Sequence, residues 1–176
     1  LLLEELALYF HSNSLSVIIA NNVRQRGISM GRIVGSYLAA VISTYIVGVI
    51  FISQGNIANV VAMGFQVTVA NRLDAVLHDL THMTGIYLPV IAVSMLISLP
   101  IAAIIIKYLP NLRPLGYILA GITGLIAIHV IIKLVFGISG IAPTRTFIGL
   151  LAQGLAGGFG GYMFHRLSAK RTNELS

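Results

Sequence analysis

The feature that most constrains this chain is the presence of four long stretches without a charged residue. The stretches cover residues 33–71, 80–106, 114–132 and 146–165. A helix that crosses the hydrocarbon core of a bilayer needs about 20 mainly apolar residues, so each stretch can hold one such helix. Charged residues make up 9% of the chain, whereas soluble domains contain about 25%. The chain is therefore predicted to be an integral membrane protein.

The predicted fold is an all-α bundle of four transmembrane helices in one membrane domain, residues 1–176. Backbone polar groups cannot go unpaired in hydrocarbon, so a spanning segment is either a helix or part of a closed barrel. The alternation of polar and apolar residues that a barrel strand requires is missing. The predicted spans are residues 33–52, 86–106, 115–136 and 147–164.

The basic residues near the span ends predict how the helices are oriented, because cytoplasmic loops carry an excess of Lys and Arg. With four crossings, eight basic residues fall on one side: Arg24, Arg26, Arg32, Lys107, Arg113, Arg166, Lys170 and Arg171. An odd number of crossings would divide them between the two sides. We therefore expect a protein of the cell membrane whose two termini face the cytoplasm, with residues 165–176 as a cytoplasmic tail.

Two segments lie outside the predicted spans. Residues 1–29 form a cytoplasmic or interfacial segment, in which residues 1–10 are predicted as a short interfacial helix that ends at the polar residues 11–14. Residues 56–83 carry apolar side chains at helical spacing with polar side chains opposite them. This pattern predicts an amphipathic helix on the outer surface of the membrane. A re-entrant half-helix over residues 57–70 is the alternative.

The last predicted span contains six glycines among residues 149–161. Each glycine costs a helix about 1 kcal/mol relative to alanine, so this density needs a packing reason. Helices in lipid associate through close backbone approach over small residues, as in GxxxG pairs. The residues of these faces are Gly154, Gly157, Gly158 and Gly161 in the last span and Gly31, Gly35 and Ala39 in the first. We expect them to pack helices together, within the chain or between protomers.

His78 and His82 are four residues apart on the predicted outer helix, so their rings share one face and could bind a divalent metal. Asp79 is the nearest candidate for a third ligand, because it lies three residues before His82. The alternative interpretation is a wetted polar face, since an HxxxH pair without the HExxH pattern is a weak indication of a metal.

His129 and Lys133 are also four residues apart, in the outward half of the third predicted span. Ionisable residues at this depth are costly and usually face the protein interior or a water-filled cavity. Lys133 can instead extend to the outer headgroups, and His129 can be a neutral buried side chain bonded to a hydroxyl or carbonyl group. With Gln153 and the run of residues 43–45 as polar partners, they predict a polar vestibule that opens outward.

The motifs GxSxG, Walker A, GxGxxG and HExxH are all missing, and no predicted span contains Asp or Glu. An enzyme is therefore not favoured, no catalytic residue is predicted, and no cofactor is expected apart from the possible metal. The basic residues are scattered singly, so nucleic acid is not an expected partner.

Three functions remain open. The first is an oligomeric transport or channel component in which His129, Lys133 and Gln153 line a polar path. The second is a non-catalytic membrane subunit or scaffold whose glycine faces bind a partner. The third is a metal-dependent membrane enzyme. The expected partners are the lipid bilayer and either further copies of the chain or another membrane subunit.

Overall fold

The computed structural model describes residues 2–137 and 142–169, with side chains described for residues 30–137 and 144–169. Every regular element in these residues is helical. Four of the helical segments are long and apolar enough to cross a membrane: Met30–Ala62, Tyr87–Ile106, Pro110–Phe136 and Phe147–Ser168. The all-α fold with four candidate spans is therefore confirmed. Lys170 and Arg171 of the predicted tail lie outside the described residues.

The first helix, α1, covers Leu2–Ala62. The chain divides into two compact units, Leu1–Gly35 and Ser36–Ser176, and α1 begins in the first and ends in the second. The expectation that a short helix ends at residues 11–14 is wrong, because α1 continues through them. Ser and Asn cost a helix interior at most about 0.7 kcal/mol each. The sequence has no proline before Pro89, so nothing stronger breaks the helix there.

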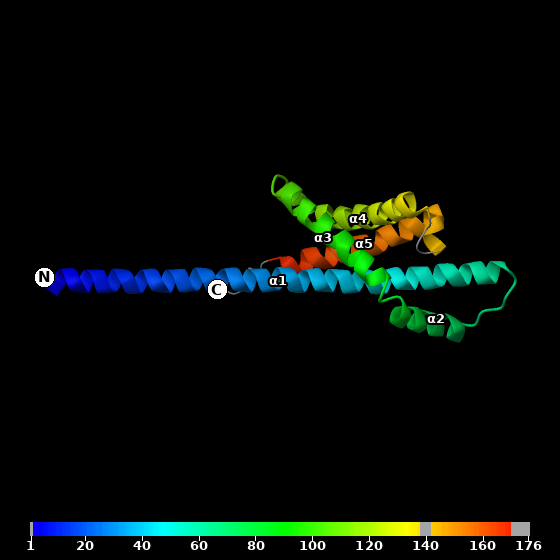
Figure 1. The fold of residues 1–176 in the computed structure, drawn as a ribbon, viewed down its shortest axis with the longest axis horizontal. Coiled ribbons are helices and arrows are strands. Elements are labelled where there is room, and N and C mark those ends of the chain that lie inside the picture. The colour runs from blue at the N-terminus through cyan, green and yellow to red at the C-terminus, as the bar shows by residue number, and fades with distance from the viewer. Residues whose placement is uncertain (1, 138–141, 170–176) are drawn as a thin grey trace. The chain divides into compact units, whose positions relative to one another are not determined.

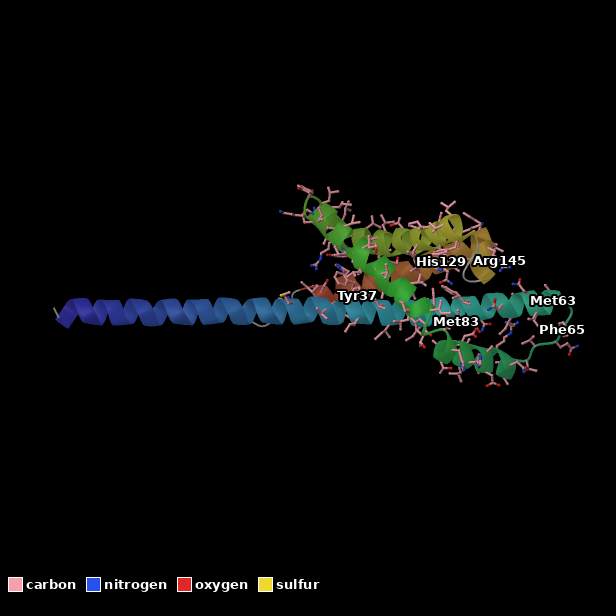
Figure 2. The ribbon with its side chains drawn as sticks, in the orientation of Figure 1. Tyr37, Met63, Phe65, Met83, His129 and Arg145 are labelled. Carbon is pink, nitrogen blue, oxygen red and sulfur yellow. The ribbon has the colours of Figure 1, made fainter. Side chains whose placement is uncertain are left out.

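The single amphipathic helix expected over residues 56–83 is also wrong, because the chain leaves the helix after Ala62. Gly64 has φ +91°, a left-handed conformation that favours glycine and stops the helix. A second helix, α2, covers Val69–His82 and begins with a capping box. In it, the Thr68 side chain accepts a hydrogen bond from the Asn71 backbone N–H, and the Asn71 side chain accepts one from the Thr68 N–H. Figure 2 labels Met63 and Phe65, two exposed apolar residues of this turn.

The remaining chain forms three long helices, whose predicted spans agree closely with the structure. The elements are α3 (Tyr87–Ile106), the short 3-10 helix η1 (Pro110–Leu112), α4 (Arg113–Phe136), the 3-10 helix η2 (Ala142–Arg145) and α5 (Phe147–Ser168). Helix α4 packs along α5 and also against α3 (Figure 1). At one end of the α4–α5 pair, the Arg113 guanidinium donates a hydrogen bond to Ser168 Oγ (3.2 Å). At the other end, α4 stops at Gly137, which has φ +67°.

The glycines of α5 let the backbones of α4 and α5 meet. A Cβ placed on Gly121 of α4 would collide with the backbone carbonyl of Gly157, and a Cβ on Gly157 would collide with the carbonyl of Gly121. Gly161 lies equally close to the Tyr117 carbonyl. Gly154 and Gly158 instead make room for isoleucine side chains of α4. The α5 glycines therefore pack closely against α4 inside the chain.

The small residues of the first predicted span are less closely surrounded than the α5 glycines. Gly31 and Gly35 belong to the first compact unit, and no heavy atom lies within 4 Å of a Cβ built on either. Ala39 is half-buried. Helix α1 meets α5 further along, where a Cβ on Gly160 would collide with the Thr44 hydroxyl. Repeated small residues show that a helix can be approached closely, but they do not specify which neighbour approaches it.

Candidate functional site

A hydrogen-bonded polar cluster lies inside the bundle, formed by α1, α3 and α5. Tyr87 and Gln153 are 0% and 1% exposed, so water reaches neither side chain. The Tyr87 hydroxyl donates a hydrogen bond to Gln153 Oε1, and Gln153 Nε2 donates one to the backbone carbonyl of Gly48 (3.3 Å). A buried amide without partners would cost several kcal/mol in an apolar interior, roughly 2–7 by transfer measurements. These bonds therefore stabilise the position of Gln153 between three helices.

Glycine at position 48 is what allows this arrangement. A Cβ on Gly48 would collide with the Tyr87 hydroxyl and would lie 3.1 Å from Gln153 Oε1. Any other residue would push the two side chains away from the α1 backbone. The absence of a side chain here thus creates the space in which the polar pair is held.

His129 of α4 lies beside this cluster. Its ring is 8% exposed and meets the Tyr87 ring edge-on, with 6.2 Å between the ring centres. His129 Nδ1 lies 2.7 Å from the Leu125 carbonyl oxygen. A carbonyl only accepts, so Nδ1 carries the hydrogen, and in the neutral ring Nε2 keeps a lone pair. Among the described residues, Nε2 has no hydrogen-bond partner.

His129 also forms part of the wall of a cleft where α4 ends and α5 begins. We call it the α4–α5 cleft, and its volume is about 560 Å³. It is lined by His129, Val130, Lys133, Leu134, Gly137, Thr144, Arg145, Thr146, Phe147 and Leu150. Figure 2 shows the labelled residues His129 and Arg145 at this end of the two helices. His129 therefore belongs both to the cleft and to the buried polar cluster.

Two of the three residues predicted for the polar path come together in the cleft, and the third is reached through a residue that was not predicted. His129 and Lys133 both line the cleft, whereas Gln153 is buried and does not line it. Tyr87 connects His129 to Gln153, because it contacts both side chains.

The prediction that residues 43–45 supply polar partners for His129 and Lys133 is wrong. The Ser43 hydroxyl donates to the Ala40 carbonyl of its own helix, and the Tyr45 hydroxyl donates to the Leu80 carbonyl of α2. The Thr44 hydroxyl has no hydrogen-bond partner in the described part of the chain. Tyr87, which takes their place, stands at the start of a span, and a polar tip on an aromatic ring there was the available indication.

The candidate metal ligands do not gather into a site. His78 and His82 stack with 3.9 Å between their ring centres and a 16° angle between their planes. His82 Nδ1 is 2.8 Å from the His78 carbonyl oxygen. Within residues 30–137 and 144–169, no three His, Cys, Asp or Glu side chains lie where they could hold one metal ion. Asp79 thus does not complete a site with the two histidines.

A second cavity lies between α3 and α4, with a volume of about 470 Å³ and almost entirely apolar walls. The hydroxyls of Ser94 and Ser98 border it and have no hydrogen-bond partner among the described atoms. The cavity lacks charged side chains, so its chemistry is less specific than that of the α4–α5 cleft.

Comparison of the chain with protein-family models, with curated proteins and with solved structures found no match.

Proposed function

We propose that the chain is a small polytopic membrane protein that acts as a transport or channel component, with the α4–α5 cleft as the outward entrance of its path. The observation that carries this proposal is the position of His129, which lines the cleft and touches Tyr87 of the buried cluster. Polar side chains on three different helices thus follow one another from the cleft to the α1 backbone. Such groups are expensive in a membrane interior, and their usual reason is a path for a solute.

The described conformation is a closed one in this proposal. Tyr87 and Gln153 are buried and do not line the cleft, so a solute that enters the cleft first meets His129, whose ring contacts Tyr87. Passage requires Tyr87 to leave Gln153, which breaks one hydrogen bond. A bond between membrane helices contributes about 1 kcal/mol, so the opening is accessible to thermal motion on this account.

The same proposal includes the topology. Both termini face the cytoplasm, and the cleft and the α1–α2 turn face outward. The support is the distribution of basic residues, since Lys107, Arg113 and Arg166 lie at the ends of α3, α4 and α5 that are remote from the cleft. Assembly into an oligomer in the cell membrane remains part of the hypothesis.

The test measures solute flux in reconstituted vesicles by light scattering, with urea, glycerol, potassium chloride and potassium acetate as the solutes. We expect the parent protein to raise the flux of at least one solute above that of protein-free vesicles. The His129→Ala variant should lose this increase, because it removes the group that joins the cleft to the cluster. The Tyr108→Phe variant is the control, since Tyr108 is exposed and does not line the cleft.

Flux of all four solutes equal to that of empty vesicles would refute the proposal. Flux that His129→Ala leaves unchanged, at equal protein and with an unchanged elution volume on a sizing column, would refute the role of the cleft. The scaffold alternative is less favoured, because α4 already occupies the face of Gly157 and Gly161.

A further inference from the structure

The charged groups of the α4–α5 cleft all have one sign. Lys133 and Arg145 line it, and no Asp or Glu is among its described lining residues. Neither cation forms an ion pair or a hydrogen bond with another described residue. The described walls of the cleft therefore carry a positive field that no described acidic side chain neutralises.

The backbone contributes in the same direction. Helix α5 begins at Phe147, which lines the cleft, and Thr146 caps it by accepting a hydrogen bond from the Gly149 N–H (3.1 Å). The N-terminal end of a helix carries a partial positive charge of about half an elementary unit. An anion in the cleft would thus meet two side-chain cations and the positive end of a helix.

His129 gives an independent indication that something binds here. Its side chain is only 8% exposed, it lines the cleft, and its Nε2 has no partner in the described part of the structure. Buried polar atoms are nearly always hydrogen-bonded, so this unpaired nitrogen offers an unused acceptor beside the cleft.

The size and the remaining walls of the cleft restrict the ligand further. Its volume of about 560 Å³ is far larger than an inorganic ion requires and falls in the range of small-molecule sites, about 300–1,000 Å³. Val130, Leu134, Phe147 and Leu150 supply apolar surface next to the cations. A ligand that satisfies both kinds of wall has an anionic head and an apolar body.

We propose that the α4–α5 cleft binds an organic anion, in which a carboxylate or phosphate group meets Lys133 and Arg145 and an apolar portion meets Phe147 and Leu150. This inference deepens the proposed function by naming the chemical class of the solute, and it rests on that proposal for its role in transport. Two sources share this chemistry: a soluble organic acid, and the headgroup region of an anionic lipid.

The test is calorimetric titration of the full chain in nanodiscs of zwitterionic phosphatidylcholine, with hexanoate as the probe and protein-free nanodiscs as the blank. Hexanamide has the same apolar body without the charge and should bind roughly tenfold more weakly or worse, because a charge-assisted hydrogen bond is lost. Lys133→Gln and Arg145→Gln should each weaken hexanoate binding by about tenfold for the same reason.

Lys107→Gln is the matched control, because Lys107 is an exposed cation at the opposite end of α3 and does not line the cleft. It should bind hexanoate like the parent. All three variants alter exposed or cleft-lining side chains outside the core, and the same elution volume on a sizing column shows that each remains folded.

A second arm identifies the source of the anion. In nanodiscs that contain phosphatidylglycerol, a tenfold weaker affinity for hexanoate shows that the lipid headgroup competes for the cleft, and an unchanged affinity assigns the site to a soluble anion. Equal binding of hexanamide and hexanoate, or parent-like binding by the Lys133→Gln, Arg145→Gln double variant, overturns the anion site. The titration involves no flux, so failure of the anion site and failure of the transport proposal are separate results.

Discussion

The contact between Tyr87 and Gln153 determines much of what the interior of this protein can do. We expect Tyr87→Phe to lower the free energy of unfolding in mixed detergent micelles by about 1 kcal/mol, the value of a hydrogen bond between membrane helices. The loss arises because Gln153 Oε1 then keeps no donor among the described residues. Tyr108→Phe changes an exposed tyrosine in the same way and should leave stability unaltered.

The double variant Tyr87→Phe, Gln153→Leu distinguishes a true pair from two independent side chains. If the two groups stabilise each other, the loss in the double variant is smaller than the sum of the two single losses. Strictly additive losses, or a Tyr87→Phe variant as stable as Tyr108→Phe, would contradict the pair.

At this scale the sequence predicts residue types better than it predicts partners. Polar or ionisable residues in a span stand out against their apolar neighbours, so His129, Lys133 and Gln153 are found directly. Tyr87 is harder to find, because an aromatic residue at a helix end is equally typical of the membrane interface. The roles of Gly48 and Arg145 can be recognised only in the folded structure. Gly48 provides the space for the Tyr87–Gln153 pair, and Arg145 lines the α4–α5 cleft.

The close packing of α4 against α5 depends on glycine in both helices. Gly121→Ala would place a Cβ 2.6 Å from the backbone carbonyl carbon of Gly157, and backbone cannot yield as a flexible side chain does. We expect the α4–α5 pair to be pushed apart and the free energy of unfolding to fall by about 2 kcal/mol, the middle of the range for overpacked cores.

Gly35→Ala is the matched control, because Gly35 is also helical and a Cβ there meets no heavy atom within 4 Å. It should be neutral or stabilising by up to about 1 kcal/mol, the difference in helix propensity. Unfolding in detergent measures both variants. A Gly121→Ala variant as stable as the parent would mean that the two helices are not in backbone contact.

The sequence predicts the positions of the helices better than it predicts the points where a helix is interrupted. Long apolar stretches bounded by charged residues predict α3, α4 and α5 to within a few residues at most ends. The break at Gly64 is missed because apolar residues continue at helical spacing on both sides of it. A single residue with positive φ and a capping box at Thr68 end one helix and begin the next, and these are local backbone events that periodicity does not record.

For the whole molecule, the absence of cysteine allows the topology to be tested with single introduced thiols. Gln66 in the α1–α2 turn and Asn111 in the α3–α4 connection are both exposed. With both termini in the cytoplasm, Gln66→Cys should react with a membrane-impermeant maleimide on intact cells, and Asn111→Cys should react only after lysis. The opposite pattern would invert the proposed topology and place the cleft inside the cell.

The backbone contact between Gly121 and Gly157 also limits how this protein can move. Each of these glycines faces the backbone carbonyl of the other with no side chain between them, so sliding or rotating one helix against the other would cause a collision, and α4 and α5 behave as one rigid block. In the proposed transport function, the path would then open by tilting the Tyr87 end of α3, together with the adjoining turns of α1, away from that block. The glycines that fix α4 against α5 thus determine that the moving elements are α3 and α1.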